Sequence, residues 1–74
     1  MGASLKVFVI ITDVLDKETE NRLFSVMWKV AYFISYHNAG NGYFEYTYGC
    51  TFGLDRELLK GVLTTNNIPF FSIE

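Results

Sequence analysis

The sequence has very few of the residues that build disulfides or metal sites. Cys50 is the only cysteine and His37 is the only histidine among the 74 residues. A disulfide within the chain is therefore excluded, and a closed zinc site, which usually takes four ligands, is not expected. A lone thiol is typical of reducing compartments. We therefore expect a cytoplasmic protein with no metal and no other cofactor.

Basic residues are also scarce. Six lysines and arginines stand against eight acidic residues, which gives a net charge of −2, and the basic residues are scattered along the chain. Proteins that bind nucleic acids usually gather basic side chains into a stripe that contacts phosphates. The charge pattern therefore argues against a nucleic-acid partner.

No stretch of the sequence is apolar for long enough to cross a bilayer. The longest apolar stretch, residues 23–36, is interrupted by Lys29. The first residues also lack the basic region of a signal peptide. We therefore expect no membrane partner.

Hydrophobic and aromatic residues are abundant instead. Half of the chain is hydrophobic, with seven phenylalanines, five tyrosines and one tryptophan, which is enough for a packed core. The length predicts a single domain over residues 1–74. Chains this short often gain stability from a disulfide, a metal or a partner subunit, so self-association is the remaining possibility.

The first half of the chain predicts a strand followed by a helix. Residues 5–12 are rich in β-branched residues, as in a central strand. Asp13 or Asp16 can cap a helix over residues 17–29. Its apolar positions recur at helical spacing, at Leu23, Val26, Met27 and Val30.

Residues 30–48 allow two interpretations. The helix could continue as far as His37, or two aromatic strands, residues 31–37 and 43–48, could form a hairpin. The segment between them, residues 38–42, is rich in asparagine and glycine, which tolerate the positive φ of tight turns. We favour the hairpin.

The last third of the sequence predicts a helix and a final strand. Asp55 can cap the helix, in which Leu54, Leu58 and Val62 line one face with Leu59 and Leu63 beside them. Asn66 and Asn67 suit its exit because asparagine tolerates the left-handed conformation. Residues 68–74 form the strand, and Pro69 places it at a sheet edge or at the start of the strand.

This element order predicts an α+β fold. It is the ferredoxin-like β-α-β-β-α-β arrangement, a four-stranded antiparallel sheet with two helices on one face. Alternation along the strands leaves apolar side chains on both faces, so the bare face is a predicted interaction surface. In the first strand, one predicted face consists of Val7, Val9 and Ile11 and the other of Phe8 and Ile10. In the second strand, the two faces are Tyr32, Ile34 and Tyr36, and Ala31, Phe33 and Ser35. In the third strand, they are Phe44, Tyr46 and Tyr48, and Tyr43, Glu45 and Thr47.

One carboxylate suggests an alternative function. Asp13, in Ile11-Thr12-Asp13-Val14, resembles the position at which small CRISPR-associated ferredoxin-like nucleases place a metal-binding aspartate in each subunit. The similarity implies a metal-dependent nuclease. It covers only the first strand and its exit, and the family's arginine and second-strand pattern are not present.

A second alternative is single-stranded nucleic-acid binding by tyrosines of the sheet. Gly42-Tyr43 is similar to the start of an RNA-recognition signature, but Phe44 and Glu45 depart from it and no basic residue precedes Gly42. The sequence also lacks the residue combinations that phosphate binding and nucleophilic catalysis need. Lys17 and Arg22 could contact phosphate, but no glycine-rich loop accompanies them. No neighbouring residues support His37 as a general base or Cys50 as a nucleophile.

The sequence therefore predicts a protein that is not an enzyme. We expect a stand-alone interaction module, homodimeric, acting as an inhibitor or adaptor of another protein. Small acidic domains without enzymatic motifs are typical of virus-encoded inhibitors. The predicted contact residues are Tyr32, Ile34, Tyr36, Tyr43, Phe70 and Phe71.

Overall fold

The computed structural model describes residues 5–50 and 53–74 and has an α+β fold. Its helices and strands follow the predicted order, and residues 30–48 form the hairpin rather than a continued helix. In chain order they are β1 (Lys6–Asp13), α1 (Lys17–Trp28), β2 (Tyr32–Asn38), β3 (Tyr43–Cys50), α2 (Arg56–Thr65) and β4 (Ser72–Ile73).

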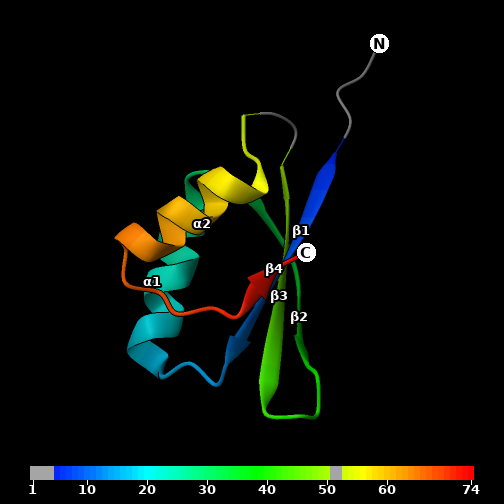
Figure 1. Ribbon diagram of the computed structural model, residues 1–74, viewed down its shortest axis with the longest axis vertical. Coiled ribbons are helices and arrows are strands. Elements are labelled where there is room, and N and C mark those ends of the chain that lie inside the picture. The colour runs from blue at the N-terminus through cyan, green and yellow to red at the C-terminus, as the bar shows by residue number, and fades with distance from the viewer. Residues whose placement is uncertain (1–4, 51–52) are drawn as a thin grey trace.

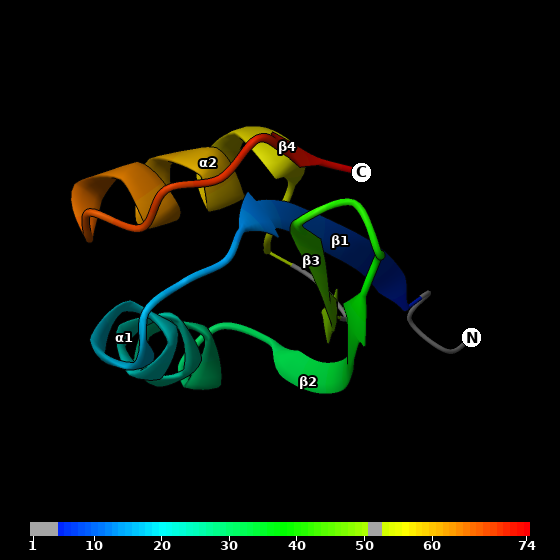
Figure 2. The same cartoon turned by 90° about the horizontal axis from the view of Figure 1, so that it is seen from below.

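The four strands form one open sheet in the order β2-β3-β1-β4, and every neighbouring pair is antiparallel. Both helices lie on the same side of this sheet (Figure 1). A view turned by 90° shows α1 on the side of β2, with which it makes contact (Figure 2). The strand β1 is central, as its apolar sequence predicts, and β2 and β4 are the two edges.

The core lies between the sheet and the helices. Alternate residues of β1 and β3 point into it, as predicted for these two strands, because successive side chains of a strand face opposite sides. Helices α1 and α2 each contribute two fully buried residues. The residues that form this core include Phe8 and Ile10, Tyr46 and Tyr48, Leu23 and Met27, and Leu59 and Leu63.

Helix α1 begins and ends close to its predicted limits. Of the two candidate caps, Asp16 is the one used: its carboxylate accepts a hydrogen bond of 2.7 Å from the backbone N–H of Thr19. This contact also lowers the pKa of Asp16. Lys29 is the C-cap, one residue beyond the last helical residue.

Helix α2 is capped by Asp55 as predicted, but its buried face differs from the prediction. The carboxylate of Asp55 accepts a hydrogen bond of 2.9 Å from the N–H of Leu58. Leu59 and Leu63 are fully buried, whereas the side chain of Leu58 is 54% exposed. The prediction for Leu58 was wrong because this leucine stripe is wide enough to fit two helix rotations one residue apart.

The predicted faces of β2 are also wrong, because a β-bulge interrupts its pairing with β3. Phe33 lies opposite Tyr48 and Tyr36 lies opposite Tyr46, with a register shift between Phe33 and Ser35. The bulge adds one residue, so the side-chain alternation changes phase. Phe33 and Tyr36 therefore share the helix-facing side with the core tyrosines.

The turn between β2 and β3 uses the residues that predicted it. Gly40 and Gly42 have φ values of 84° and 80°, which β-carbon-bearing residues rarely adopt. The side chain of Asn38 accepts a hydrogen bond from the N–H of Gly40 at 2.9 Å. Such local bonds favour a turn over a continued strand or helix.

The final strand is shorter than predicted. Asn67 takes the left-handed conformation with φ of 57°, as expected for the helix exit. Ile68 is then buried in the core and Phe70 packs against it before the chain reaches β1. The strand β4 is Ser72–Ile73, and backbone hydrogen bonds of Phe71 and Glu74 to β1 flank it.

Candidate interaction surface at the β2 edge

The strand β2 is exposed along its whole length. All seven of its residues are exposed, including Tyr32 at 65%, Phe33 at 51% and Tyr36 at 47%. It is an edge strand, with β3 on one side and no other strand of the described chain on the other. Single exposed apolar side chains are common, but a fully exposed edge strand that carries several aromatic rings is typical of a surface that pairs with another chain.

Ring contacts attach β2 to the body of the protein. Phe33 packs edge-to-face against Phe24 of α1 and against Tyr48 of β3, with ring centroids 5.7 and 5.5 Å apart. Tyr36 lies 5.3 Å from Phe44 and 5.1 Å from Tyr46. Contacts of this geometry each add about 0.5–1.5 kcal/mol beyond area burial. The strand is therefore held in place on its β3 side while its outer side is open.

A pocket of about 620 Å³ lies between the end of α1 and the start of β2. Trp28, the last residue of α1, contributes to its wall although its side chain is 86% exposed. Nearly all of the wall is apolar, which suits an apolar side chain or ring as occupant. The lining residues are Phe24, Trp28, Ala31, Tyr32, Phe33 and Tyr48.

The two core tyrosines of β3 have different hydrogen bonding. The hydroxyl of Tyr46 donates a hydrogen bond of 2.8 Å to the carboxylate of Glu20, and burial together with this carboxylate raises the pKa of Tyr46. The hydroxyl of Tyr48 is buried without a partner among the described residues. Burial raises the pKa of Tyr48 to about 12.

The edge carries no fixed charge. Residues 30–44 include no aspartate, glutamate, lysine or arginine, so the flanking charges are those of Lys29 and Glu45. Natural sheets usually protect an open edge with lysine, proline or a bulge. Here the bulge between Phe33 and Ser35 is the only one of these three devices within β2.

The open side of β2 also presents backbone groups. Ala39 donates its N–H to the carbonyl of Tyr43 at 2.9 Å, which fixes the phase of the hydrogen bonding between the two strands. Bonded and non-bonded pairs alternate along an antiparallel ladder. Ser35 and His37 therefore turn their backbone groups toward β3, while Tyr36 and Asn38 turn theirs outward.

The six predicted contact residues lie in three different places in the structure. Tyr32, Ile34 and Tyr36 all lie on β2. Tyr43 and Phe71 contact each other edge-to-face, with ring centroids 4.7 Å apart. Phe70 is half-buried and packs against the core.

Three residues of the surface were missed by the sequence interpretation. Phe24 and Phe33 form ring contacts at the base of the pocket, and Trp28 stands at its rim. The sequence did contain a signal for Trp28. The buried residues Leu23 and Met27 are four positions apart on one face of α1, and Trp28 comes one position after Met27 and so lies off that face. An apolar residue outside the buried stripe of a helix is a candidate contact residue.

The residues considered for catalysis are dispersed. Asp13 is exposed at the end of β1, His37 is exposed on β2, and Cys50 is buried at the end of β3. Within residues 5–50 and 53–74, no three histidine, cysteine or acidic side chains lie close enough together to hold a metal ion. Nor does this part of the chain contain a helix long and apolar enough to cross a membrane.

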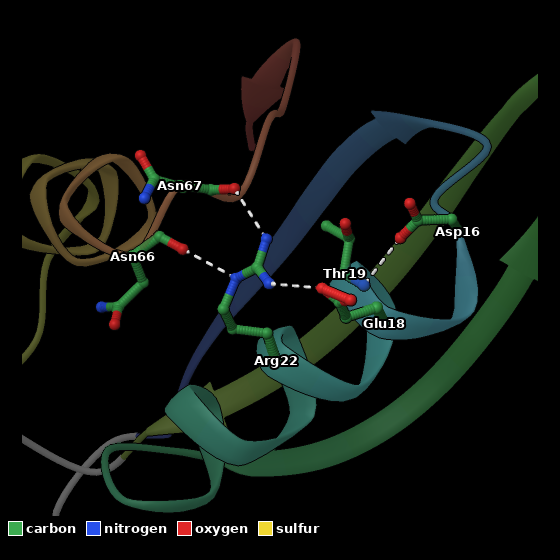
Figure 3. Close-up of polar contacts among 6 residues, drawn as sticks. All are labelled: Asp16, Glu18, Thr19, Arg22, Asn66 and Asn67. Carbon is green, nitrogen blue, oxygen red and sulfur yellow. Dashed lines mark hydrogen bonds and ion pairs between the residues drawn. The ribbon is translucent and has the colours of Figure 1, made fainter.

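Arg22 has a structural role rather than the phosphate contact considered from the sequence. Its guanidinium donates to the carbonyls of Asn66 and Asn67 at 2.9 and 3.2 Å (Figure 3). It also lies 4.0 Å from the carboxylate of Glu18, one turn earlier in α1. A cation at the end of a helix satisfies the last carbonyls and the negative end of the helix dipole. Arg22 therefore connects α1 to the exit of α2.

Comparison of the chain with family models, with curated proteins and with solved structures found no match.

Proposed function

We propose that this protein is a small interaction module that works as a homodimer. The observation that carries the proposal is the exposure of every residue of β2, an aromatic and uncharged edge strand. Burial of apolar surface contributes about 25 cal/mol per Å², so covering these rings stabilises an assembly. A chain of 74 residues has a small core of its own, which makes this gain more important.

The adjacent pocket supports the same proposal. It places Trp28 and Tyr32 beside the open strand and offers a hollow for an apolar side chain of a partner. Tryptophan and tyrosine are enriched among the residues that dominate binding energy in protein interfaces. Together the strand and the pocket form a surface with both backbone and side-chain binding groups.

We also propose the ferredoxin-like class and the role of inhibitor or adaptor. The element order, the antiparallel sheet and the two helices on one face support the class. The support for the inhibitor or adaptor role comes from the small size, the acidic composition and the lack of an enzymatic motif in the sequence. The same features support a viral origin.

Light scattering of the purified protein over a range of concentrations tests the homodimer. We expect a mass of twice the 8.5 kDa chain, with dissociation to monomer on dilution. A monomer at every concentration up to millimolar contradicts the proposal.

A matched pair of variants locates the interface. His37→Lys adds a charge to the exposed edge of β2, and Leu58→Lys adds the same charge to an exposed position of α2. We expect His37→Lys to raise the dimer dissociation constant on the order of tenfold, equivalent to about 1.4 kcal/mol, while Leu58→Lys leaves it unchanged. Equal effects of the two variants would show that the interface lies elsewhere.

A further inference from the structure

We infer that β2 pairs with the β2 strand of a second copy, antiparallel and about a two-fold axis, so that two sheets become one. The inference rests on the proposed homodimer and names the surface and the bonding that hold it together. Three observations carry it: the outward backbone groups of β2, the absence of charge along it, and the contrast with the opposite edge of the sheet.

The backbone groups provide the directional part of the contact. Tyr36 and Asn38 direct N–H and C=O groups away from β3, toward the side where the described chain has no strand. An extended chain laid along this side satisfies these groups through an antiparallel ladder. The bulge between Phe33 and Ser35 interrupts the regular edge and the turn begins after Asn38, so we place the two-fold axis within Ser35–His37.

The charge pattern selects a second copy as the occupant. Residues 30–44 carry no acidic or basic side chain, so two copies of β2 meet without like-charge repulsion. An axis at or next to Tyr36 brings the exposed Tyr36 rings of the two copies to the same part of the joined sheet, and such cross-strand aromatic contacts are favourable. A charged or polyanionic partner finds no complementary group on this edge.

The opposite edge explains why the assembly stops at two. The strand β4 has only two residues, and Pro69, shortly before it, has no N–H to donate. A two-fold contact uses the same patch on both copies and closes the assembly, whereas pairing of β2 with β4 would build an open chain of molecules. The long edge is therefore used once, in a closed dimer.

Backbone amide exchange, measured by NMR on the wild-type protein, tests the inference. In the dimer we expect the amides of Tyr36 and Asn38 to exchange at least about tenfold more slowly than in the diluted monomer, because only pairing gives them partners. The amides of Ser35 and His37 are the internal control. They bond to β3 in both states and should change little.

The outcomes separate this inference from the proposed function. A dimer by light scattering whose Tyr36 and Asn38 amides stay as fast as in the monomer keeps the homodimer but overturns edge pairing. The bare face of the sheet is then the interface, and Val7→Lys, at a side chain that is 51% exposed on β1, should dissociate that dimer. A monomer that binds an extended peptide at β2 overturns the second copy as occupant.

Discussion

The two strands of the central hairpin, β2 and β3, are both rich in aromatic residues but have opposite environments. Tyr46 and Tyr48 of β3 are buried at 0% and 2% exposure, whereas Tyr32 and Tyr36 of β2 are 65% and 47% exposed. The strand β3 lies between two neighbours and beneath the helices, while β2 has a neighbour on one side only. Composition alone therefore does not determine burial; the position of a strand in the sheet does.

This comparison has a physical consequence for the role of each strand. A buried tyrosine on β3 contributes to the stability of the monomer through packing, and its substitution leaves a cavity. Tyr32 of β2 is the most exposed of these tyrosines and contributes little to the monomer, whereas Tyr36 also holds β2 in place through its ring contacts. Substitution of Tyr46 or Tyr48 in β3 should therefore change folding, and substitution of Tyr32 in β2 should change association.

The largest expected effect comes from truncating one tyrosine on each strand. Tyr48→Ala should lower the free energy of unfolding by about 3–5 kcal/mol, the usual cost of removing a buried aromatic ring. Tyr32→Ala, on β2, should change the free energy of unfolding of the monomer by less than about 0.5 kcal/mol. Urea unfolding at concentrations where the protein is monomeric measures both. Similar losses for the two variants would contradict the division between the strands.

Alkaline pH should weaken the fold through the same buried tyrosine. The pKa of Tyr48 rises from 10.0 to about 12 on folding. Because the folded pKa is the higher one, the contribution is complete below pH 10 and is lost as the pH rises from 10 toward 12. Two pKa units set an upper limit of about 3 kcal/mol on this loss, and solvent screening makes it smaller.

Unfolding free energies measured below and above pH 10 test this loss. Tyr48→Phe should reduce the alkaline loss, whereas Tyr32→Phe on the exposed strand should retain the wild-type pH dependence. The account of Tyr48 is contradicted if both variants lose stability with pH as the wild type does.

A smaller pair of effects should distinguish the two buried hydroxyls at neutral pH. Tyr46→Phe removes the hydrogen bond to Glu20 and should lower the free energy of unfolding by about 1–2 kcal/mol. Tyr48→Phe removes a buried hydroxyl without a partner and should raise stability by up to about 1 kcal/mol. Chemical denaturation of the two variants side by side gives the signs. A loss of equal size in both would mean that the Tyr48 hydroxyl has a partner in solution.

Most of the fold could be predicted from local signals in the sequence. Asp16 and Asp55 cap the helices, Gly40 and Gly42 form the turn, and Asn67 ends α2 in the left-handed conformation. Each of these features depends on a few neighbouring residues and their backbone preferences. That is why pattern alone placed the helices and the hairpin correctly.

The errors arose where long-range packing decided the outcome. The bulge in β2 is set by the pairing with β3, and it moved Tyr36 to the helix-facing side. The rotation of α2, which exposes Leu58, depends on the sheet beneath it. The pocket combines residues from α1, β2 and β3, so the sequence pattern could not assemble it.

Disulfide cross-linking along β2 tests most directly whether this edge is covered by a second copy. Cysteine is placed singly at Ser35, Tyr36 and His37, with Leu58→Cys as an exposed control and the native Cys50 buried in every variant. A residue on a two-fold axis lies within about 4.5–5.5 Å of its own copy across an antiparallel pair, which is within disulfide range. At least one of the three β2 variants should therefore form a disulfide-linked dimer rapidly under mild oxidation, while Leu58→Cys forms no disulfide link between copies. The absence of cross-linking at all three positions, or equal cross-linking of Leu58→Cys, would contradict the account.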